Sequence, residues 1–160
     1  MDIVVMGVTG SGKSTVGRLL AERFGFRLYE GDEFHSPENI RKMSCGTPLK
    51  DEDRRPWLER LRLVVQEDAA HGGSAVVCCS ALKEAYRRIL SGPDTRFVYL
   101  KASPELVRAR LRQRTAHFMP ASLVDSQFAD LEEPNNAIVV NAAIEPQAIV
   151  EQIAKTLGLA

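Results

Sequence analysis

The sequence predicts a three-layer α/β fold, in which a five-stranded, mainly parallel sheet carries helices on both faces. Short apolar runs alternate along the chain with longer segments of helical period, as in domains built from successive strand and helix units. With 160 residues, of which 44% are hydrophobic, the chain can bury one core of ordinary size. We therefore expect a single domain that spans residues 1–160.

The predicted strands are five apolar runs, at residues 2–6, 26–30, 74–80, 96–102 and 136–141. The first, third and last are nearly continuous β-branched runs, which is typical of strands covered on both faces. Between and after the runs, apolar residues recur at helical spacing in segments 16–24, 57–65 and 149–157. In such a sheet, ligands bind beyond the carboxyl ends of the strands.

Two stretches interrupt this alternation, at residues 36–56 and 114–134. Both are polar, contain prolines and are too long for ordinary connections. The first predicts a substrate-binding insertion and the second a lid over the active face.

Composition restricts the class of partner. The chain has 21 basic and 21 acidic residues, so no net field attracts nucleic acid or an anionic membrane. The opening "MDIVVMG" is too short an apolar run for a signal sequence or a membrane span, which predicts a cytoplasmic protein. The three cysteines have no CxxC spacing, which favours reduced thiols over a disulfide framework or a zinc site.

A phosphate-binding loop is predicted directly after the first strand, in "GVTGSGKST". The stretch matches GxxxxGK[ST] between a strand and a helix, and its glycines let successive N–H groups turn toward phosphate oxygens. Lys13 would reach the β- and γ-phosphates and Ser14 would ligate Mg²⁺. The alternative is a glycine-rich turn without a ligand. The motif predicts a P-loop NTPase fold that binds ATP and Mg²⁺ through Gly7, Val8, Thr9, Gly10, Ser11, Gly12, Lys13, Ser14 and Thr15.

Other features of the sequence limit which molecules could accept the phosphate. The chain has no NKxD guanine-reading motif, and Ser80 stands at the end of the third strand, where many P-loop ATPases place a magnesium-orienting Asp. Asp32 follows the second strand and could accept a proton from a hydroxyl or hold Mg²⁺ through water; a helix cap is the alternative. His35 could donate to a polyol or lie on a surface loop.

Basic residues in three places are candidates for anion binding. Arginines in the cleft would suit a carboxylate, and we favour Arg55 over Arg54 and Arg87 over Arg88, although spacing alone does not decide between neighbours. Further along, Arg110 and Arg114 lie one helical turn apart and could approach the nucleotide phosphates on lid closure, whereas Arg108 and Arg112 fit a solvated surface.

Taken together, these segments resemble the gluconate kinases of the P-loop, nucleoside-monophosphate-kinase-like type. The resemblance runs through nearly the whole chain and is carried by "GVTGSGKST", "GDEFHSPENIRKMSCGTPLKDEDRRPWL", "CSALKEAYRRIL" and "RLRQRTAHFMPASLVDSQFADLEEP". It implies transfer of the ATP γ-phosphate to the 6-hydroxyl of D-gluconate, and it implies a homodimer. It also implies that Asp32 lies beside that hydroxyl, that Arg110 and Arg114 serve the lid, and that the sugar acid is surrounded by His35, Arg55, Lys83, Arg87 and His117.

Two alternatives remain open at this point: a kinase for another small acid such as shikimate, and a non-catalytic ATP-binding regulator. One departure from the resembled family is Asn141, after the fifth strand, where an acidic residue is frequent.

Overall fold

A computed structural model of the chain describes residues 1–114 and 121–159 and confirms the three-layer α/β fold. One five-stranded sheet has the order β2-β3-β1-β4-β5, and every neighbouring pair is parallel. The strands are β1 (Asp2–Met6), β2 (Arg27–Glu30), β3 (Ala75–Cys78), β4 (Thr95–Lys101) and β5 (Ile138–Asn141). All five lie within the predicted runs or within one residue of them.

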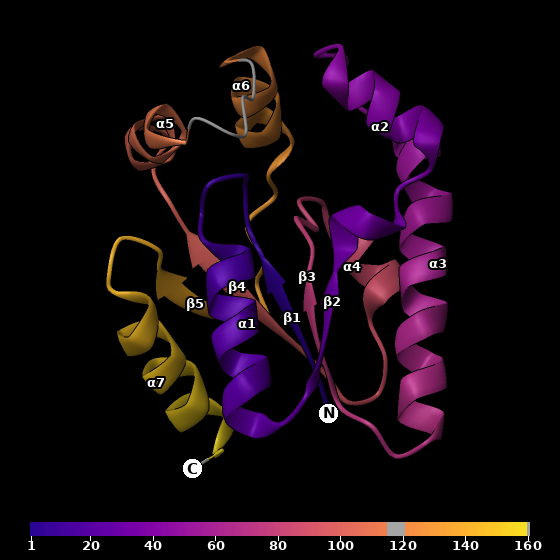
Figure 1. The fold of residues 1–160 in the computed structure, drawn as a ribbon, viewed down its shortest axis with the longest axis vertical. Helices are drawn as coiled ribbons and strands as arrows, with labels where there is room; N and C mark the ends of the chain where they lie inside the picture. Colours follow the sequence, from indigo (N-terminus) through magenta and orange to yellow (C-terminus); the bar gives the residue numbers. More distant parts are fainter. Residues whose placement is uncertain (115–120, 160) are drawn as a thin grey trace.

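Helices cover the two faces of this sheet (Figure 1). On one face lie α1 (Lys13–Phe24) and α7 (Pro146–Leu157); on the other lie α3 (Asp51–Ala70) and α4 (Glu84–Leu90). Alternate residues of β1 enter the two resulting cores: Ile3 and Val5 face α1 and α7, whereas Val4 and Met6 face α3 and α4. No helix within the described residues is long and apolar enough to span a membrane.

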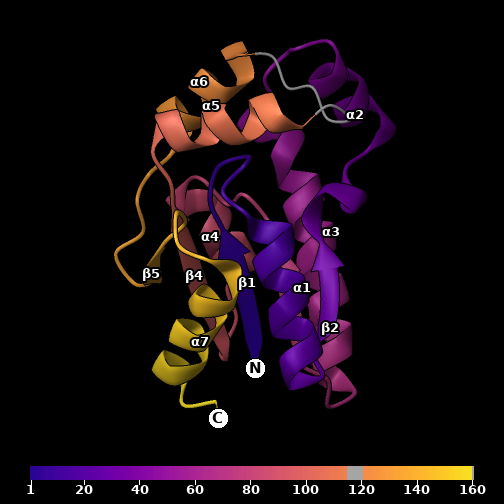
Figure 2. The same cartoon turned by 60° about the vertical axis from the view of Figure 1, so that its left-hand side comes forward.

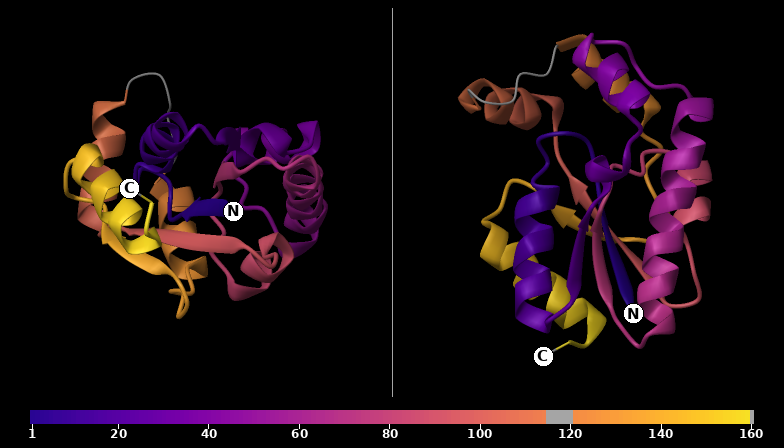
Figure 3. Two further views of the ribbon diagram at one scale, coloured as in Figure 1. Left: turned by 90° about the horizontal axis from the view of Figure 1, so that it is seen from below. Right: turned by 45° about the vertical axis from the view of Figure 1, so that its right-hand side comes forward.

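Three further helices lie beyond the carboxyl ends of the strands, where a ligand is expected (Figure 2). They are α2 (Pro37–Ser44), α5 (Pro104–Gln113) and α6 (Ala121–Asp130); a short 3-10 helix, η1 (Gly31–Phe34), follows β2 directly. In the right-hand view of Figure 3, α5 and α6 lie at the end of the molecule opposite the two termini. The segment predicted as a substrate-binding insertion thus contains α2 and the start of α3, and the segment predicted as a lid contains α6.

Local sequence sets where two of these helices begin. Ser36 precedes Pro37 and its hydroxyl accepts a hydrogen bond from Asn39 N at 3.1 Å; Ser103 precedes Pro104 and accepts one from Leu106 N at 3.1 Å. A Ser cap followed by Pro satisfies a free helical N–H and begins the helix with a compatible φ angle. Both helices therefore begin at defined points beside the cleft.

Two expectations about the fold are wrong in detail. The residues of β5 are not covered on both faces: Val139 is 54% exposed, because β5 is an edge strand that α7 covers on one side only. The helical segment expected at residues 57–65 is longer in the structure, where α3 begins at Asp51 and Pro56 lies inside it. The helix begins earlier because Asp53 accepts a hydrogen bond from Lys50 N at 2.9 Å and so satisfies an N–H at the helix start.

Candidate active site

The phosphate-binding loop occupies the turn from β1 into α1, as the motif predicts. Gly7 has φ 148°, and a Cβ atom there would lie 2.9 Å from the carbonyl oxygen of Leu100. Gly12 caps α1 in the left-handed region, with φ 101°. A side chain would strain both positions, so glycine is required for the backbone to curl around an anion at the positive end of α1.

Lys13 lies folded over this loop. Its Nζ donates to the carbonyl oxygens of Gly7 at 3.0 Å and Val8 at 2.9 Å. Burial lowers the pKa of Lys13 from its usual 10.5, and the nearby carboxylate of Asp32 opposes that shift. A phosphate would offer this ammonium a stronger, charged partner than the two carbonyls.

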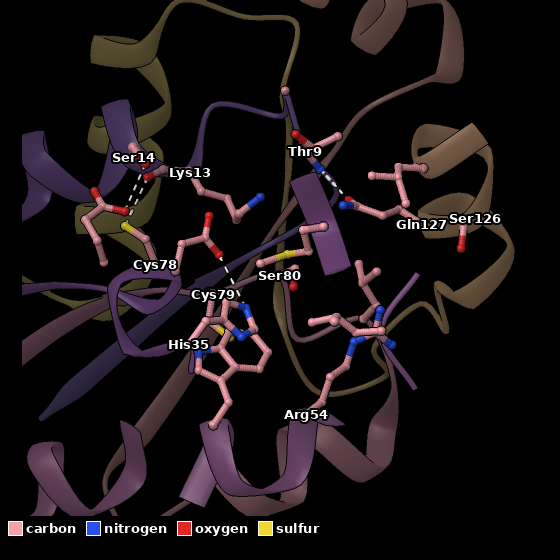
Figure 4. A pocket seen from close by; sticks show the side chains of 18 of the residues that line it. Thr9, Lys13, Ser14, His35, Arg54, Cys78, Cys79, Ser80, Ser126 and Gln127 are labelled. Carbon is pink, nitrogen blue, oxygen red and sulfur yellow. Dashed lines mark hydrogen bonds and ion pairs between the residues drawn. The ribbon is translucent and has the colours of Figure 1, made fainter. Parts of the chain in front are cut away.

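The loop opens into a cavity of about 220 Å³ at the carboxyl edge of the sheet (Figure 4). From the predicted site, the cavity is lined by Thr9, Gly10, Gly12, Lys13, Ser14, Thr15, Asp32, His35 and Arg114. Residues between Asp32 and Trp57 supply one wall, and α6 contributes Leu123, Ser126 and Gln127 to another. The structure therefore brings the phosphate loop together with Asp32 and His35, two of the predicted acceptor residues, at a single cavity.

Oxygen ligands that suit a magnesium ion meet at the end of β2. Ser14 Oγ donates to Glu30 Oε2 at 3.0 Å, and Asp32, with its side chain 93% exposed, lines the same cavity. Mg²⁺ in nucleotide sites takes one or two protein oxygens and completes its shell with water and phosphate. Ser14, Glu30 and Asp32 fit the coordination of such a Mg²⁺ ion. No group of three or more acidic, His or Cys ligands occurs in the described residues. Glu30 was not predicted; its place at the end of β2, two residues before Asp32, was an available signal.

His35 is held with a defined orientation. Its ring stacks on Trp57 with centroids 3.9 Å apart, and its Nδ1 lies 3.3 Å from Asn39 Nδ2. Because the amide nitrogen is a donor, Nδ1 must accept, and the ring proton then resides on Nε2, which lies 3.9 Å from Asp32 Oδ1. Burial lowers the pKa of His35 and so favours this neutral ring. The arrangement presents an N–H donor and a carboxylate side by side.

Of the two adjacent arginines at the start of α3, Arg54 lines the cavity and Arg55 does not. Arg54 donates to Tyr86 Oη at 2.7 Å and lies 3.5 Å from Asp130 of α6, whereas the side chain of Arg55 is exposed and outside the cavity lining. Both residues belong to the first turns of α3, which presents one of them to the cleft and its neighbour to solvent. Sequence alone could not choose between them, because the start of α3 was unknown.

Lys83 and Arg87, the remaining basic candidates within the described residues, have partners away from the cavity. Lys83 forms an ion pair with Asp51 at 3.1 Å and Arg87 is buried, donating to the carbonyls of Ala81 at 2.8 Å and Glu132 at 2.9 Å. Neither lines the cavity. Through its bond to Glu132, Arg87 connects α4 to the segment that follows α6. His117 lies outside the described residues.

Arg110 and Arg114 do not share one helical face, because α5 ends at Gln113 and Arg114 is extended. Arg110 donates to the carbonyls of Gly10 at 3.2 Å and Ser11 at 3.1 Å, so it contacts the phosphate loop from outside. Arg114 lines the cavity. The two arginines therefore approach the loop from different directions.

A residue without a predicted role contacts the loop directly. Gln127 of α6 accepts a hydrogen bond from Thr9 N at 2.7 Å through its Oε1 (Figure 4). It stands in the "SQF" part of the segment that carried the family resemblance, but one helix in isolation does not show which residue meets the loop. Leu123 and Gln127, four residues apart, share the face of α6 that lines the cavity.

Comparisons with known proteins show which family this chain resembles. A family model described as shikimate kinase matches residues 9–158. The gluconokinase of Gluconobacter oxydans (strain 621H) is 44% identical over 156 residues, which cover 94% of this chain and 88% of that protein. The solved gluconokinase of Sinorhizobium meliloti 1021 superimposes with a TM-score of 0.87 at 45% identity, covering 98% of this chain and 91% of its own.

The shikimate kinase likeness is broader and more distant. The structure of shikimate kinase from Aquifex aeolicus vf5 superimposes with a TM-score of 0.60 at 19% identity, which shows a common fold. The identity to the two gluconokinases is much higher, at 44% and 45%, over 94% and 98% of this chain. The chain therefore belongs to the gluconokinases, a group within the shikimate-kinase-like P-loop kinases.

Proposed function

We propose that this protein transfers the γ-phosphoryl group of ATP to the 6-hydroxyl of D-gluconate, giving 6-phospho-D-gluconate and ADP. The observation that carries the proposal is the single cavity into which the phosphate loop, Asp32, His35 and Arg54 all open. An acceptor with a hydroxyl at one end and a carboxylate at the other matches these groups. The family relationship supports gluconate as that acceptor.

The nucleotide half of the site comprises Gly7–Thr15. The loop amides and the N-terminus of α1 would hold the phosphates, and Lys13 would leave its carbonyl partners to bind the β- and γ-phosphates. Ser14 would ligate Mg²⁺, with Glu30 and Asp32 near its water shell. When bound, that ion neutralises charge on the β- and γ-phosphate oxygens. Arg110 would steady the loop and Arg114 would approach the phosphates.

In the acceptor half, Asp32 would accept the proton of the attacking hydroxyl. The neutral His35 ring would orient the same hydroxyl through Nε2–H, which lies on the Asp32 side of the ring. Arg54 is buried enough to bind the carboxylate with little competition from water, with 13% of its side chain exposed. We therefore assign to Arg54 the role that the resemblance implied for Arg55. Lys83 and Arg87 carry no part of the proposal because both lie outside the cavity lining.

The reaction is an in-line transfer without a covalent enzyme intermediate. Lys13 and Arg114 spread the charge of the transition state. Asp32 and His35 keep the attacking hydroxyl in line with the leaving oxygen. Closure of the segment around residues 114–134 over the cavity would exclude water and so suppress hydrolysis of ATP.

The test is a coupled assay for ADP release with Mg-ATP against D-gluconate, shikimate, related sugar acids and a blank without acceptor. We expect turnover with gluconate and formation of 6-phosphogluconate. Turnover with shikimate alone would favour the other small-acid kinase, and ATP binding without turnover on any acceptor would favour a non-catalytic regulator.

The homodimer and the cytoplasmic location stay predictions. Light scattering on the purified protein tests the first, with a mass near twice the 17.7 kDa of one chain as the expected result. Fractionation of the source cells tests the second.

A further inference from the structure

The contact between α6 and the phosphate loop joins two parts of the chain that are 118 residues apart. Gln127 Oε1 lies 2.7 Å from Thr9 N, which is shorter than most N–H···O hydrogen bonds in proteins. A side chain on the predicted lid therefore occupies an amide of the loop that is proposed to hold the phosphates.

The position of Gln127 is determined by packing on the neighbouring face of α6. Val124 and Phe128 belong to a small apolar cluster with Val8 of the loop and Val107 of α5. Just after α6, the chain is fixed to the body of the protein, because Glu132 N donates to Leu82 O at 2.8 Å. Both attachments hold the backbone of Gln127 beside the loop.

The chemistry of the amide determines its orientation. Thr9 N–H is a donor, so the branch of the carboxamide that faces it must be Oε1, and Nε2 is then the branch that remains available as a donor. Gln127 also lines the cavity that contains Lys13 and Asp32. Its carboxamide thus lies between the loop and the space in which phosphate and acceptor would meet.

The same helix contacts the acceptor side of the cavity. Asp130 lies 3.5 Å from Arg54, the proposed carboxylate-binding residue. Gln127 and Asp130 are three residues apart, so they project from neighbouring positions on one helix. A shift of α6 would therefore change the loop and the acceptor wall together.

We propose that Gln127 is a positioning residue for phosphoryl transfer, which holds the Thr9 end of the phosphate loop in register with the acceptor wall through its hydrogen bond to Thr9 N–H. This inference rests on the proposed kinase function. The rate of phosphoryl transfer then depends on Gln127, whereas ATP affinity need not. The remaining loop amides, Lys13 and Ser14 are unchanged when Gln127 is replaced.

The test replaces Gln127 by residues of similar length. Gln127→Met keeps the packing but cannot accept the Thr9 hydrogen bond, and Gln127→Glu keeps an oxygen acceptor but places a negative charge in a phosphate-binding cavity. The matched control is Gln152→Met on the exposed face of α7. For each protein we would measure kcat, KM for ATP, the melting temperature and the hydrogen-exchange rate of the Thr9 amide by NMR.

For Gln127→Met we expect kcat to fall about ten- to hundredfold, as for small misplacements of reacting groups, with KM for ATP changed less than about threefold. Exchange of the Thr9 amide should become faster while the melting temperature stays close to that of the control. Gln127→Glu should keep the Thr9 amide protected and should instead raise KM for ATP, because like charges repel.

A methionine variant with wild-type kcat would overturn the inference. So would a loss of kcat without faster exchange at Thr9, because the hydrogen bond would then not be the cause. Failure of the proposed function is seen separately, as a wild-type protein that releases no ADP with gluconate. The exchange measurement still tests the Gln127–Thr9 contact in that case.

Discussion

Replacement of Gly17 by alanine tests how closely α1 packs on the sheet. Gly17 lies in the middle of α1, and a Cβ atom there would be 2.2 Å from the Sγ atom of Cys78, which is buried on β3. Leu28 and Val76 would also be in contact, at 3.5 and 3.6 Å. The sulfur also donates a hydrogen bond to the carbonyl oxygen of Lys13 at 3.3 Å, which a displaced sulfur would lose.

Two opposing effects set the magnitude of this change. Alanine is a better helix former than glycine by about 1 kcal/mol, which by itself would stabilise α1. Forcing a methyl group into a well-packed core costs roughly 1–3 kcal/mol or more, and an overlap as close as 2.2 Å belongs at the upper end of that range. We therefore expect Gly17→Ala to lower the free energy of unfolding by about 1–2 kcal/mol.

Urea unfolding of four proteins measures the effect: wild type, Gly17→Ala, Cys78→Ala and the double variant. Cys78→Ala removes the sulfur that the new methyl group meets, so the double variant should be at least as stable as Gly17→Ala. The two changes should then be non-additive, with a favourable coupling of about 1–2 kcal/mol. A Gly17→Ala protein as stable as wild type, or strictly additive changes, would refute the packing argument.

The remaining predictions concern activity and pH. Lys13→Ala should abolish turnover, and Asp32→Asn should lower kcat far more than ATP affinity, as measured by initial rates and by calorimetric titration with ATP. Arg54→Ala should raise KM for gluconate about tenfold or more, whereas Arg55→Ala should leave it within about twofold in the same assay, because a buried charge-assisted contact is lost only in the first. The free energy of unfolding should fall as pH falls below 6.5, the usual pKa of histidine, because the pKa of His35 is lower in the folded protein. The stabilisation that the neutral His35 contributes is present above pH 6.5 and is lost as pH falls toward the pKa of the folded state. In His35→Gln the loss between pH 7 and 5, measured by urea unfolding, should be smaller.

The phosphate loop illustrates what local sequence can predict. Its conformation depends on glycines that accept positive φ and on the helix that begins at Lys13, and all of these lie within nine consecutive residues. The alternation of apolar runs likewise identified the five strands, because each run must be buried by its neighbours. The exposed face of β5 was not predicted, since a β-branched run reads the same at the edge of a sheet as at its centre.

The basic residues illustrate what the local sequence cannot predict. Arg54, Arg55 and Arg87 are equally plausible in the sequence as carboxylate-binding residues. In the structure α3 places Arg54 at the cavity and Arg55 in solvent, and Arg87 donates hydrogen bonds to backbone carbonyls instead. Which of two adjacent side chains enters a cleft depends on where the helix begins and how it is rotated against the sheet. Those quantities are set by packing with distant segments.

The sequence by itself determined the α/β architecture and the phosphate loop, and it supported the gluconokinase resemblance that the comparisons confirmed, because each of these depends on short-range patterns of apolar, glycine and charged residues. Only the tertiary structure decided that Arg54 lines the cavity, that Glu30 meets Ser14 and that Gln127 of α6 binds Thr9 of the loop. These contacts join residues that are 16 to 118 positions apart, and their geometry exists only once the helices have packed on the sheet.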